Sequence, residues 1–134
     1  MNLDKKIAIV VREDLLTWQK LNVTAFLASG FGTQDIMGEN YKDKSGKIYL
    51  PMSGQPILIY CANKEEMKKI LEKAVNRDIE ISIYNEEMFS TNNDVDNRAM
   101  IKKYATEELE PIGLGLCGKK QHIDKTLHGY RLHP

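Results

Sequence analysis

The segment IAIVV, residues 7–11, decides the fold class, because a continuous run of mostly β-branched apolar residues is typical of a strand covered on both faces. The segment ILIY, residues 57–60, is a second such run, and IGLGLC, residues 112–117, is apolar with interspersed glycines. We expect these three segments to be central strands. Residues 79–83 (IEISI) instead alternate between apolar and polar side chains, which predicts a strand with one wetter face, nearer an edge.

Helical patterns lie between these runs. The clearest covers residues 63–76, where apolar residues recur every three or four positions and form one buried stripe. Asn63 can cap this helix and Glu66 can reach back to it, as in a capping box. A second helix is expected over residues 18–31, with Val23, Phe26, Leu27 and Phe31 as its buried stripe and with Gly30 and Gly32 ending it.

A third helix is expected to begin near Asp94 and to continue toward Glu110, where Pro111 would stop it. The segment YKDKSGKIYLPMSGQP, residues 41–56, holds a Ser-Gly turn between short apolar stretches. This pattern predicts a hairpin or an Ω-type excursion after the first helix.

Strands that alternate with crossover helices indicate a three-layer α/β/α fold, with a mostly parallel mixed sheet of about four to five strands. No repeat or linker divides the sequence, so we expect residues 1–134 to form a single α/β domain. Ligands of such sheets usually bind beyond the carboxyl ends of the strands. The segments to search are therefore residues 12–20, 60–64, 84–98 and 117–125.

Charge and composition exclude several function classes. Lys plus Arg and Asp plus Glu each total 19 in 134 residues, so no net charge draws the whole molecule to nucleic acid or to an anionic membrane. The apolar run near the N-terminus is too short for a secretory signal or a membrane span. We therefore expect a soluble, cytoplasmic protein that has no membrane partner.

The cysteines and histidines form no metal-binding pattern. Cys61 and Cys117 end two apolar runs, which favours buried core thiols. The three histidines lack the spacing and the nearby carboxylate of a metal site. We expect neither a metal nor a cofactor.

Both ends of the chain carry a family resemblance. The opening segments KIAIVVREDL (6–15) and NVTAFLASG (22–30), and the closing segment IGLGLCGKKQHIDKTLHGYRL (112–132), resemble type II peptidyl-tRNA hydrolases. Asn22, the stretch MFSTNNDVDNR (88–98) and the terminal GYRLH resemble more closely a bacterial family of unknown function, DUF2000, which is grouped with that fold. The resemblance implies a type II peptidyl-tRNA hydrolase-like fold and, through it, hydrolysis of aminoacyl-tRNA, peptidyl-tRNA or another ester or amide.

The same resemblance assigns catalytic roles residue by residue. Asn22 stands where the hydrolases have a lysine that opens a helix, and Lys20 lies two residues earlier and can serve instead. The family's catalytic aspartate falls near Asn85 and Glu86, and Thr91 stands near the family's threonine. If the site is catalytic, Lys20 or Asn22 is the electrophile and Glu86 and Thr91 assist. Because both charged groups of the family are replaced, a rate advantage of several powers of ten is expected to be lost.

The polar stretch 88–98 follows a strand, where functional loops tend to lie. It is our preferred ligand loop, because Asn93 and Asn97 offer donors and acceptors and Arg98 offers a planar fork for a carboxylate or phosphate. The structural alternative stays open: Asn93 or Asp94 caps the third helix, and Arg98 pairs with Asp94 one turn away.

The segment CGKKQHIDK, residues 117–125, offers a second anion site at a helix start. Lys119 and Lys125 are candidate ligands there, although solvated lysines are the alternative. From Lys119 to Arg131 four basic residues oppose Asp124 alone, and this patch can contact an RNA backbone. A helix end beside lysines can also lower the pKa of a thiol, which makes Cys117 a candidate nucleophile with core burial as its alternative.

Three functions follow as hypotheses. The first is a binding domain that holds a small anionic or nucleotide-like ligand, or an RNA fragment, in a cleft among Arg12, Asn22, residues 91–98 and Lys125. The second is the hydrolase. The third is a structural role as a homodimer. The first two require the opening and closing segments of the chain to lie side by side in one sheet.

Overall fold

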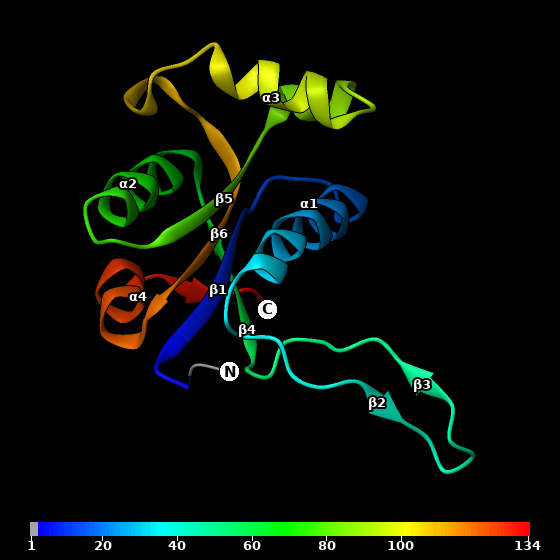
Figure 1. Cartoon of the computed structure of the whole chain (residues 1–134). Helices are drawn as coiled ribbons and strands as arrows, with labels where there is room; N and C mark the ends of the chain where they lie inside the picture. The colour runs from blue at the N-terminus through cyan, green and yellow to red at the C-terminus, as the bar shows by residue number, and fades with distance from the viewer. Residues whose placement is uncertain (1–2) are drawn as a thin grey trace.

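Our computed structural model describes residues 3–134. Over this range the chain forms one five-stranded sheet, a separate two-stranded hairpin and four α-helices, three of which pack on the larger sheet (Figure 1). The order of strands in the larger sheet is β5-β6-β1-β4-β7. Their bounds are β1 (Lys5–Arg12), β4 (Ile57–Ala62), β5 (Glu80–Asn85), β6 (Pro111–Lys119) and β7 (Arg131–Leu132).

The four predicted strands are confirmed, and the edge position of β5 is confirmed as well. The opening and closing segments lie side by side, because β1 pairs with β6 over Lys5–Val11. The expectation of a mostly parallel sheet is wrong: within the described residues only β1 and β4 pair in parallel, and the other three pairings are antiparallel. The reason is that the chain leaves β5 and re-enters the sheet as β6 at the same edge, without crossing over.

The direction of β6 places three strand ends together. Because β5 and β1 both run antiparallel to β6, β5 runs in the same direction as β1 and β4. Arg12, Ala62 and Asn85, the last residues of these strands, therefore lie at one edge of the sheet. The connection from β5 to β6, residues 86–110, begins and ends at that edge.

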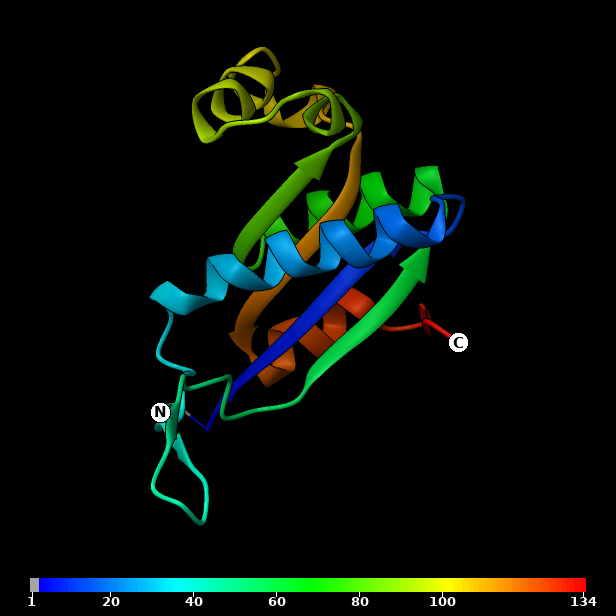
Figure 2. The same ribbon diagram turned by 90° about the vertical axis from the view of Figure 1, so that its right-hand side faces the viewer.

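Helices cover both faces of the sheet. Helix α1 (Thr17–Ser29), with the short 3-10 helix η1 (Gly30–Thr33), packs on one face, and α2 (Lys64–Val75) and α4 (Lys120–Leu127) pack together on the other (Figures 1 and 2). The β5–β6 connection holds η2 (Glu86–Ser90), α3 (Asp94–Lys102) and η3 (Thr106–Glu108), and α3 lies beyond the end of β5 (Figure 1). Among residues 3–134 no helix is both long enough and apolar enough to cross a bilayer.

The bounds of the first two predicted helices agree with the structure to within two residues at each end, and the third helix needs correction. The capping box of α2 is present: the Asn63 side chain accepts from the Glu66 N–H at 2.9 Å, and the Glu66 carboxylate accepts from the Asn63 N–H at 2.9 Å. The third helix ends at Lys102, and Pro111 is the first residue of β6 instead of a helix stop. Before that point the Glu108 carboxylate accepts from the Ala105 N–H at 2.8 Å, which starts a new turn.

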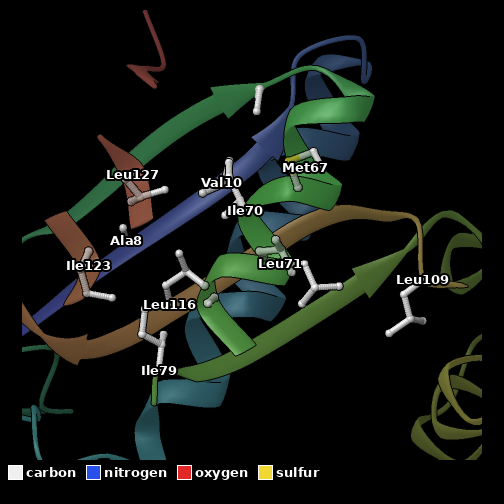
Figure 3. Packing of buried hydrophobic residues seen from close by; sticks show 13 residues of the cluster. Ala8, Val10, Met67, Ile70, Leu71, Ile79, Leu109, Leu116, Ile123 and Leu127 are labelled. Carbon is white, nitrogen blue, oxygen red and sulfur yellow. The ribbon is translucent and has the colours of Figure 1, made fainter. Parts of the chain in front are cut away.

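The core is divided by the sheet into two clusters. On one face, alternate residues of β1 and β6 pack against α2 and α4; the labelled side chains in Figure 3 include Val10, Leu116, Ile70 and Ile123. On the other face, the remaining β1 residues pack against Val23, Leu27 and Phe31. Residues 7–11 are at most 1% exposed, which confirms a central strand covered on both faces.

Glycines of β6 let α1 approach the sheet closely. A Cβ atom on Gly113 would lie 2.5 Å from Val23 Cγ1, and one on Gly115 would lie 2.2 Å from Ser82 Oγ. The Ser82 hydroxyl in turn donates to the Leu27 carbonyl of α1 at 2.9 Å. The interspersed glycines of residues 112–117 therefore fix the distance between α1 and the sheet.

The hairpin predicted in residues 41–56 is confirmed as β2 (Tyr41–Lys42) and β3 (Ile48–Tyr49), and it projects away from the sheet (Figures 1 and 2). Gly46 occupies its turn with φ of 88°, a conformation that favours glycine. The Asp43 carboxylate accepts hydrogen bonds from the N–H groups of Ser45 and Lys47 and from the Tyr49 hydroxyl. These bonds close the turn without help from the rest of the molecule.

Candidate functional site

The candidate site consists of two hollows beside β5 and the β5–β6 connection. The first has a volume of about 450 Å³ and is bounded by α1, β5, η2 and the start of α3. We call it the aromatic–amide hollow, because its lining includes aromatic residues (Trp18, Tyr84 and Phe89) and polar residues, two of them amides (Asn22, Thr91 and Asn97). The second lies at the shared edge where β1, β4 and β5 end.

The aromatic wall is a chain of contacting rings. The Trp18 and Phe89 ring centroids are 5.6 Å apart, Phe89 and Tyr84 are 5.2 Å apart, and Tyr84 and Phe26 are 6.1 Å apart. These separations are those of favourable aromatic pairs. Trp18 is 56% exposed and Phe26 is 55% exposed, so both retain free surface. The prediction that Phe26 belongs to the buried stripe of α1 is therefore wrong: the side chain lies in the wall of the hollow.

The polar part of the lining comes from α1, from the loop before α3 and from α3. The Thr91 hydroxyl is hydrogen-bonded to the Met88 carbonyl oxygen at 2.9 Å and to the side chain of Asn97. Asn93 caps α3, because its side-chain oxygen accepts from the Asp96 N–H at 2.8 Å. Within residues 3–134 the exposed Asn22 carboxamide has no hydrogen-bond partner, so it is free to bind.

The structure brings four predicted residues, Asn22, Thr91, Asn93 and Asn97, into the wall of one hollow. Arg98 does not join them. Its guanidinium pairs with Asp94 at 2.8 Å, and its side chain is 76% exposed. The structural alternative for Asn93 and Arg98 is therefore realised. Of the described residues, those lining this hollow include no Lys, Arg or His side chain.

The second hollow, which we call the acidic hollow, has a volume of about 410 Å³. Two basic residues line it, Arg12 and Lys64. Arg12 Nε is directed to Asp14 Oδ1 at 2.6 Å, and Lys64 Nζ lies 3.5 Å from Glu110. Four carboxylates also line the hollow: Glu86, Glu87, Glu108 and Glu110. With two cations against four anions, its lining is net negative.

Two uncharged residues, Asn85 and Tyr104, also line the acidic hollow. Asn85 is only 4% exposed, and across residues 3–134 no group donates to its buried Oδ1. The Tyr104 hydroxyl donates to Glu87 Oε1 at 2.7 Å. This hydrogen bond, burial, and the negative charges of Glu87, Glu110 and Glu108 raise the pKa of Tyr104. The charges act in the direction expected for a group in a negative potential.

The four residues with predicted catalytic roles do not converge. Asn22 and Thr91 line the aromatic–amide hollow, whereas Glu86 lines the acidic hollow. Lys20 lies outside both, with its Nζ 3.1 Å from Nε2 of His133 near the C-terminus. An electrophile and its assisting groups must lie within hydrogen-bond reach of one substrate atom. Of the four, only Asn22 and Thr91 line the same hollow.

The candidate anion ligands Lys119 and Lys125 lie elsewhere. Lys119 pairs in register with Lys5 at the start of β1, so it lies at the opposite end of the sheet from Arg12, roughly 23 Å away for seven strand steps. Lys125 is exposed on α4, across the sheet from α1. Neither lysine belongs to a cleft with Arg12 and Asn22.

Cys117 does not have the activated thiol of a nucleophile. It is 1% exposed in the core cluster under α1, and burial raises its pKa, with a smaller opposing effect from Lys5. Cys61 is also buried, and neither cysteine forms a disulfide. The core alternative is confirmed for both. In residues 3–134 no three His, Cys, Asp or Glu side chains are gathered closely enough to hold a metal ion.

The aromatic wall and the role of residues 104–110 were not predicted from the sequence. Trp18, Asn22 and Phe26 are spaced by four residues, so they project from one side of α1, and this spacing was the available signal. Glu108 and Glu110 carried no comparable signal, because they reach the acidic hollow only through the return of the chain to β6.

The fold and the hollows define the class of the protein: a mixed α/β protein with helices on both faces of its sheet and its polar hollows at one edge. The chain belongs to the DUF2000 family of proteins of unknown function, whose profile matches residues 5–134. A solved structure of a protein of unknown function from Agrobacterium tumefaciens strain C58 is 41% identical in sequence. The alignment covers 99% of this chain and 100% of that chain with a TM-score of 0.92. No curated protein matches the sequence.

Proposed function

We propose that this protein binds a small nucleoside-like molecule in the aromatic–amide hollow. One observation carries the proposal: contacting aromatic rings and several side-chain amides line the same hollow, which is large enough for a small ligand. A nucleobase has a flat face that stacks on aromatic rings and an edge that exchanges hydrogen bonds with amides. The hollow offers both kinds of contact.

The charges bear on which part of a nucleotide would bind. Phosphate and carboxylate groups are usually held by Arg, Lys or exposed main-chain N–H groups. The lining of this hollow in the described chain has Asp94 as its charged side chain, and Arg98 outside it neutralises that group. The hollow is therefore better suited to an uncharged nucleoside than to the anionic or nucleotide-like ligand expected from the sequence.

Hydrolysis of aminoacyl-tRNA, peptidyl-tRNA or another ester or amide has less support. Asn22 and Thr91 share a hollow, but Glu86 and Lys20 lie outside it.

We also propose that the scaffold is the three-layer, type II peptidyl-tRNA hydrolase-like fold. The pairing of β1 with β6 and the helices on both faces are consistent with it. The homodimer hypothesis stays a prediction, and light scattering would test it.

Trp18 provides a direct test, because it is the chain's one tryptophan and lies in the wall of the hollow. Titration with adenosine, guanosine, cytidine and uridine is expected to change Trp18 fluorescence with saturation for at least one nucleoside. Stacking on an aromatic side chain contributes about 1–3 kcal/mol, so Phe89→Leu is expected to weaken binding by roughly five-fold or more. Asn22→Ala is expected to weaken it as well.

The matched control is Leu21→Ala, which changes an exposed residue of α1 next to Asn22 and outside the hollow. This variant is expected to bind as the unmodified protein does. The proposal is wrong if no nucleoside changes Trp18 fluorescence at millimolar concentration. It is equally wrong if Phe89→Leu and Leu21→Ala have the same affinity.

A further inference from the structure

We propose that the acidic hollow is a second binding site, whose ligand is a small organic cation with a protonated primary amine. The proposal is independent of the nucleoside hypothesis. It rests on two separate features of the same hollow: an excess of carboxylates, and a buried carboxamide oxygen that has no donor.

The carboxylates are only partly neutralised. Glu110 pairs with Lys64 at 3.5 Å and with Lys68 at 4.0 Å. Glu87 accepts from the Tyr104 hydroxyl and lies 3.8 Å from Lys103. Glu86 is exposed, and no cation among residues 3–134 pairs with it, so its charge is available to a ligand.

The cations of the hollow are already occupied by carboxylates. Arg12 is directed to Asp14, and Lys64 is directed to Glu110. An anionic ligand would therefore have to displace these partners and meet the unpaired charge of Glu86. A cationic ligand meets neither obstacle, because like charges repel and opposite charges attract at such distances.

Asn85 is the independent observation that points to a ligand. Buried polar atoms nearly always have a hydrogen-bond partner, and an exception calls for an explanation. Asn85 is one of the residues that line the hollow, and in the described chain its Oδ1 has no hydrogen-bond partner. Its main-chain N–H is directed to the Met88 sulfur at 3.3 Å, so the unpartnered group of this residue is the side-chain oxygen.

A protonated amine matches this pair of features. It carries three N–H donors and no acceptor, so it can donate to the Asn85 oxygen and to the Glu86 carboxylate at once. These two residues are consecutive, at the end of β5 and the start of η2. The position is also the usual one for ligands of α/β sheets, beyond the carboxyl ends of β1, β4 and β5.

The experiment is a titration of the isotope-labelled protein with putrescine, followed by ¹H–¹⁵N NMR and calorimetry. Putrescine is expected to shift the Asn85 side-chain signals and the Glu86 amide with saturation, whereas 1,4-butanediol and succinate, its neutral and anionic analogues, shift neither. Glu86→Gln is expected to weaken putrescine binding at least five-fold. Glu107→Gln, which removes a nearby charge outside this hollow, is expected to leave it unchanged.

Two Asn85 variants separate binding from folding. Asn85→Leu removes the acceptor and is expected to weaken binding at least five-fold. Asn85→Asp keeps the shape of the side chain, adds a charge, and is expected to tighten binding. The proposal is overturned if putrescine shifts only residues outside the hollow, or if Glu86→Gln and Glu107→Gln weaken binding equally. Binding of magnesium chloride but not of putrescine would also overturn it, and none of these results depends on Trp18.

Discussion

Replacement of Gly115 by alanine is expected to destabilise the protein, because α1, η1 and β5 meet over this residue. A Cβ atom at this position would lie 2.2 Å from Ser82 Oγ and 2.7 Å from Phe31 Cζ. Both neighbours are fixed: Ser82 donates to the Leu27 carbonyl at 2.9 Å, and Phe31 is only 3% exposed. The added methyl group therefore cannot be accommodated without moving α1 or breaking the hydrogen bond.

The size of the effect follows from these two contacts. Overpacking of a filled core costs about 1–3 kcal/mol. If Ser82 rotates away, the loss of its hydrogen bond to α1 adds about 1 kcal/mol. We therefore expect Gly115→Ala to lower the free energy of unfolding by about 2–4 kcal/mol. This is a large part of the stability of a typical domain, about 5–15 kcal/mol.

Urea unfolding followed by circular dichroism measures this difference, and Gly118→Ala in the same strand is the matched control. A Cβ atom on Gly118 would lie 3.4 Å from its nearest neighbour, Ile79, so we expect a change below about 1 kcal/mol. Removing Ser82 Oγ removes the closest contact, so Gly115→Ala combined with Ser82→Ala is expected to lose less than the sum of the single changes. Equal unfolding midpoints for Gly115→Ala and Gly118→Ala would refute the packing argument.

Three further predictions concern the hairpin, the thiols and α3. Hydrogen bonds from Tyr49 and from turn N–H groups lower the pKa of Asp43. The stabilisation that these bonds give the folded state is therefore fully present above the unfolded pKa of about 3.9, and it is lost as the pH falls through the lower folded pKa. The hydrogen bond to Asp43 raises the pKa of Tyr49. Its stabilisation of the folded state is therefore fully present below the unfolded pKa of about 10, and it is lost as the pH rises through the higher folded pKa. NMR titration checks both, and an Asp43 that titrates near 3.9 contradicts the first. Because Cys61 and Cys117 are buried, they are expected to react with a thiol reagent only after unfolding, and fast reaction of the native protein would contradict this. Because α3 has no buried residue in the described chain whereas α2 has several, amide hydrogens of α3 are expected to exchange faster, and equal protection would contradict that.

The strands were predictable from sequence because burial on both faces leaves a local signal. Residues 7–11 are apolar at every position, and the structure covers both of their sides. The alternation in residues 79–83 likewise identified the edge strand. The capping box of α2 depends on Asn63 and Glu66, which are close in sequence, so it too could be predicted.

Strand direction and the membership of the hollows depend on contacts between distant segments. The periodicity of α1 did not show that Phe26 faces a hollow, because exposed and buried apolar residues look alike in sequence. Arg98 illustrates the opposite error. Its guanidinium group was expected to contact a ligand, but it forms an ion pair with Asp94, one helical turn away. A nearby partner of opposite charge was the stronger signal.

The antiparallel return of the chain accounts for both hollows. Had residues 86–110 crossed the sheet as a parallel connection requires, β6 would begin at the far edge, and the polar groups of this segment would be spread along one face. Because β6 begins where β5 ends, the whole segment stays at one edge of the sheet. η2 consequently contributes Met88 and Phe89 to the aromatic–amide hollow and Glu86 and Glu87 to the acidic hollow. Each hollow is therefore completed by a segment whose position follows from the direction of one strand.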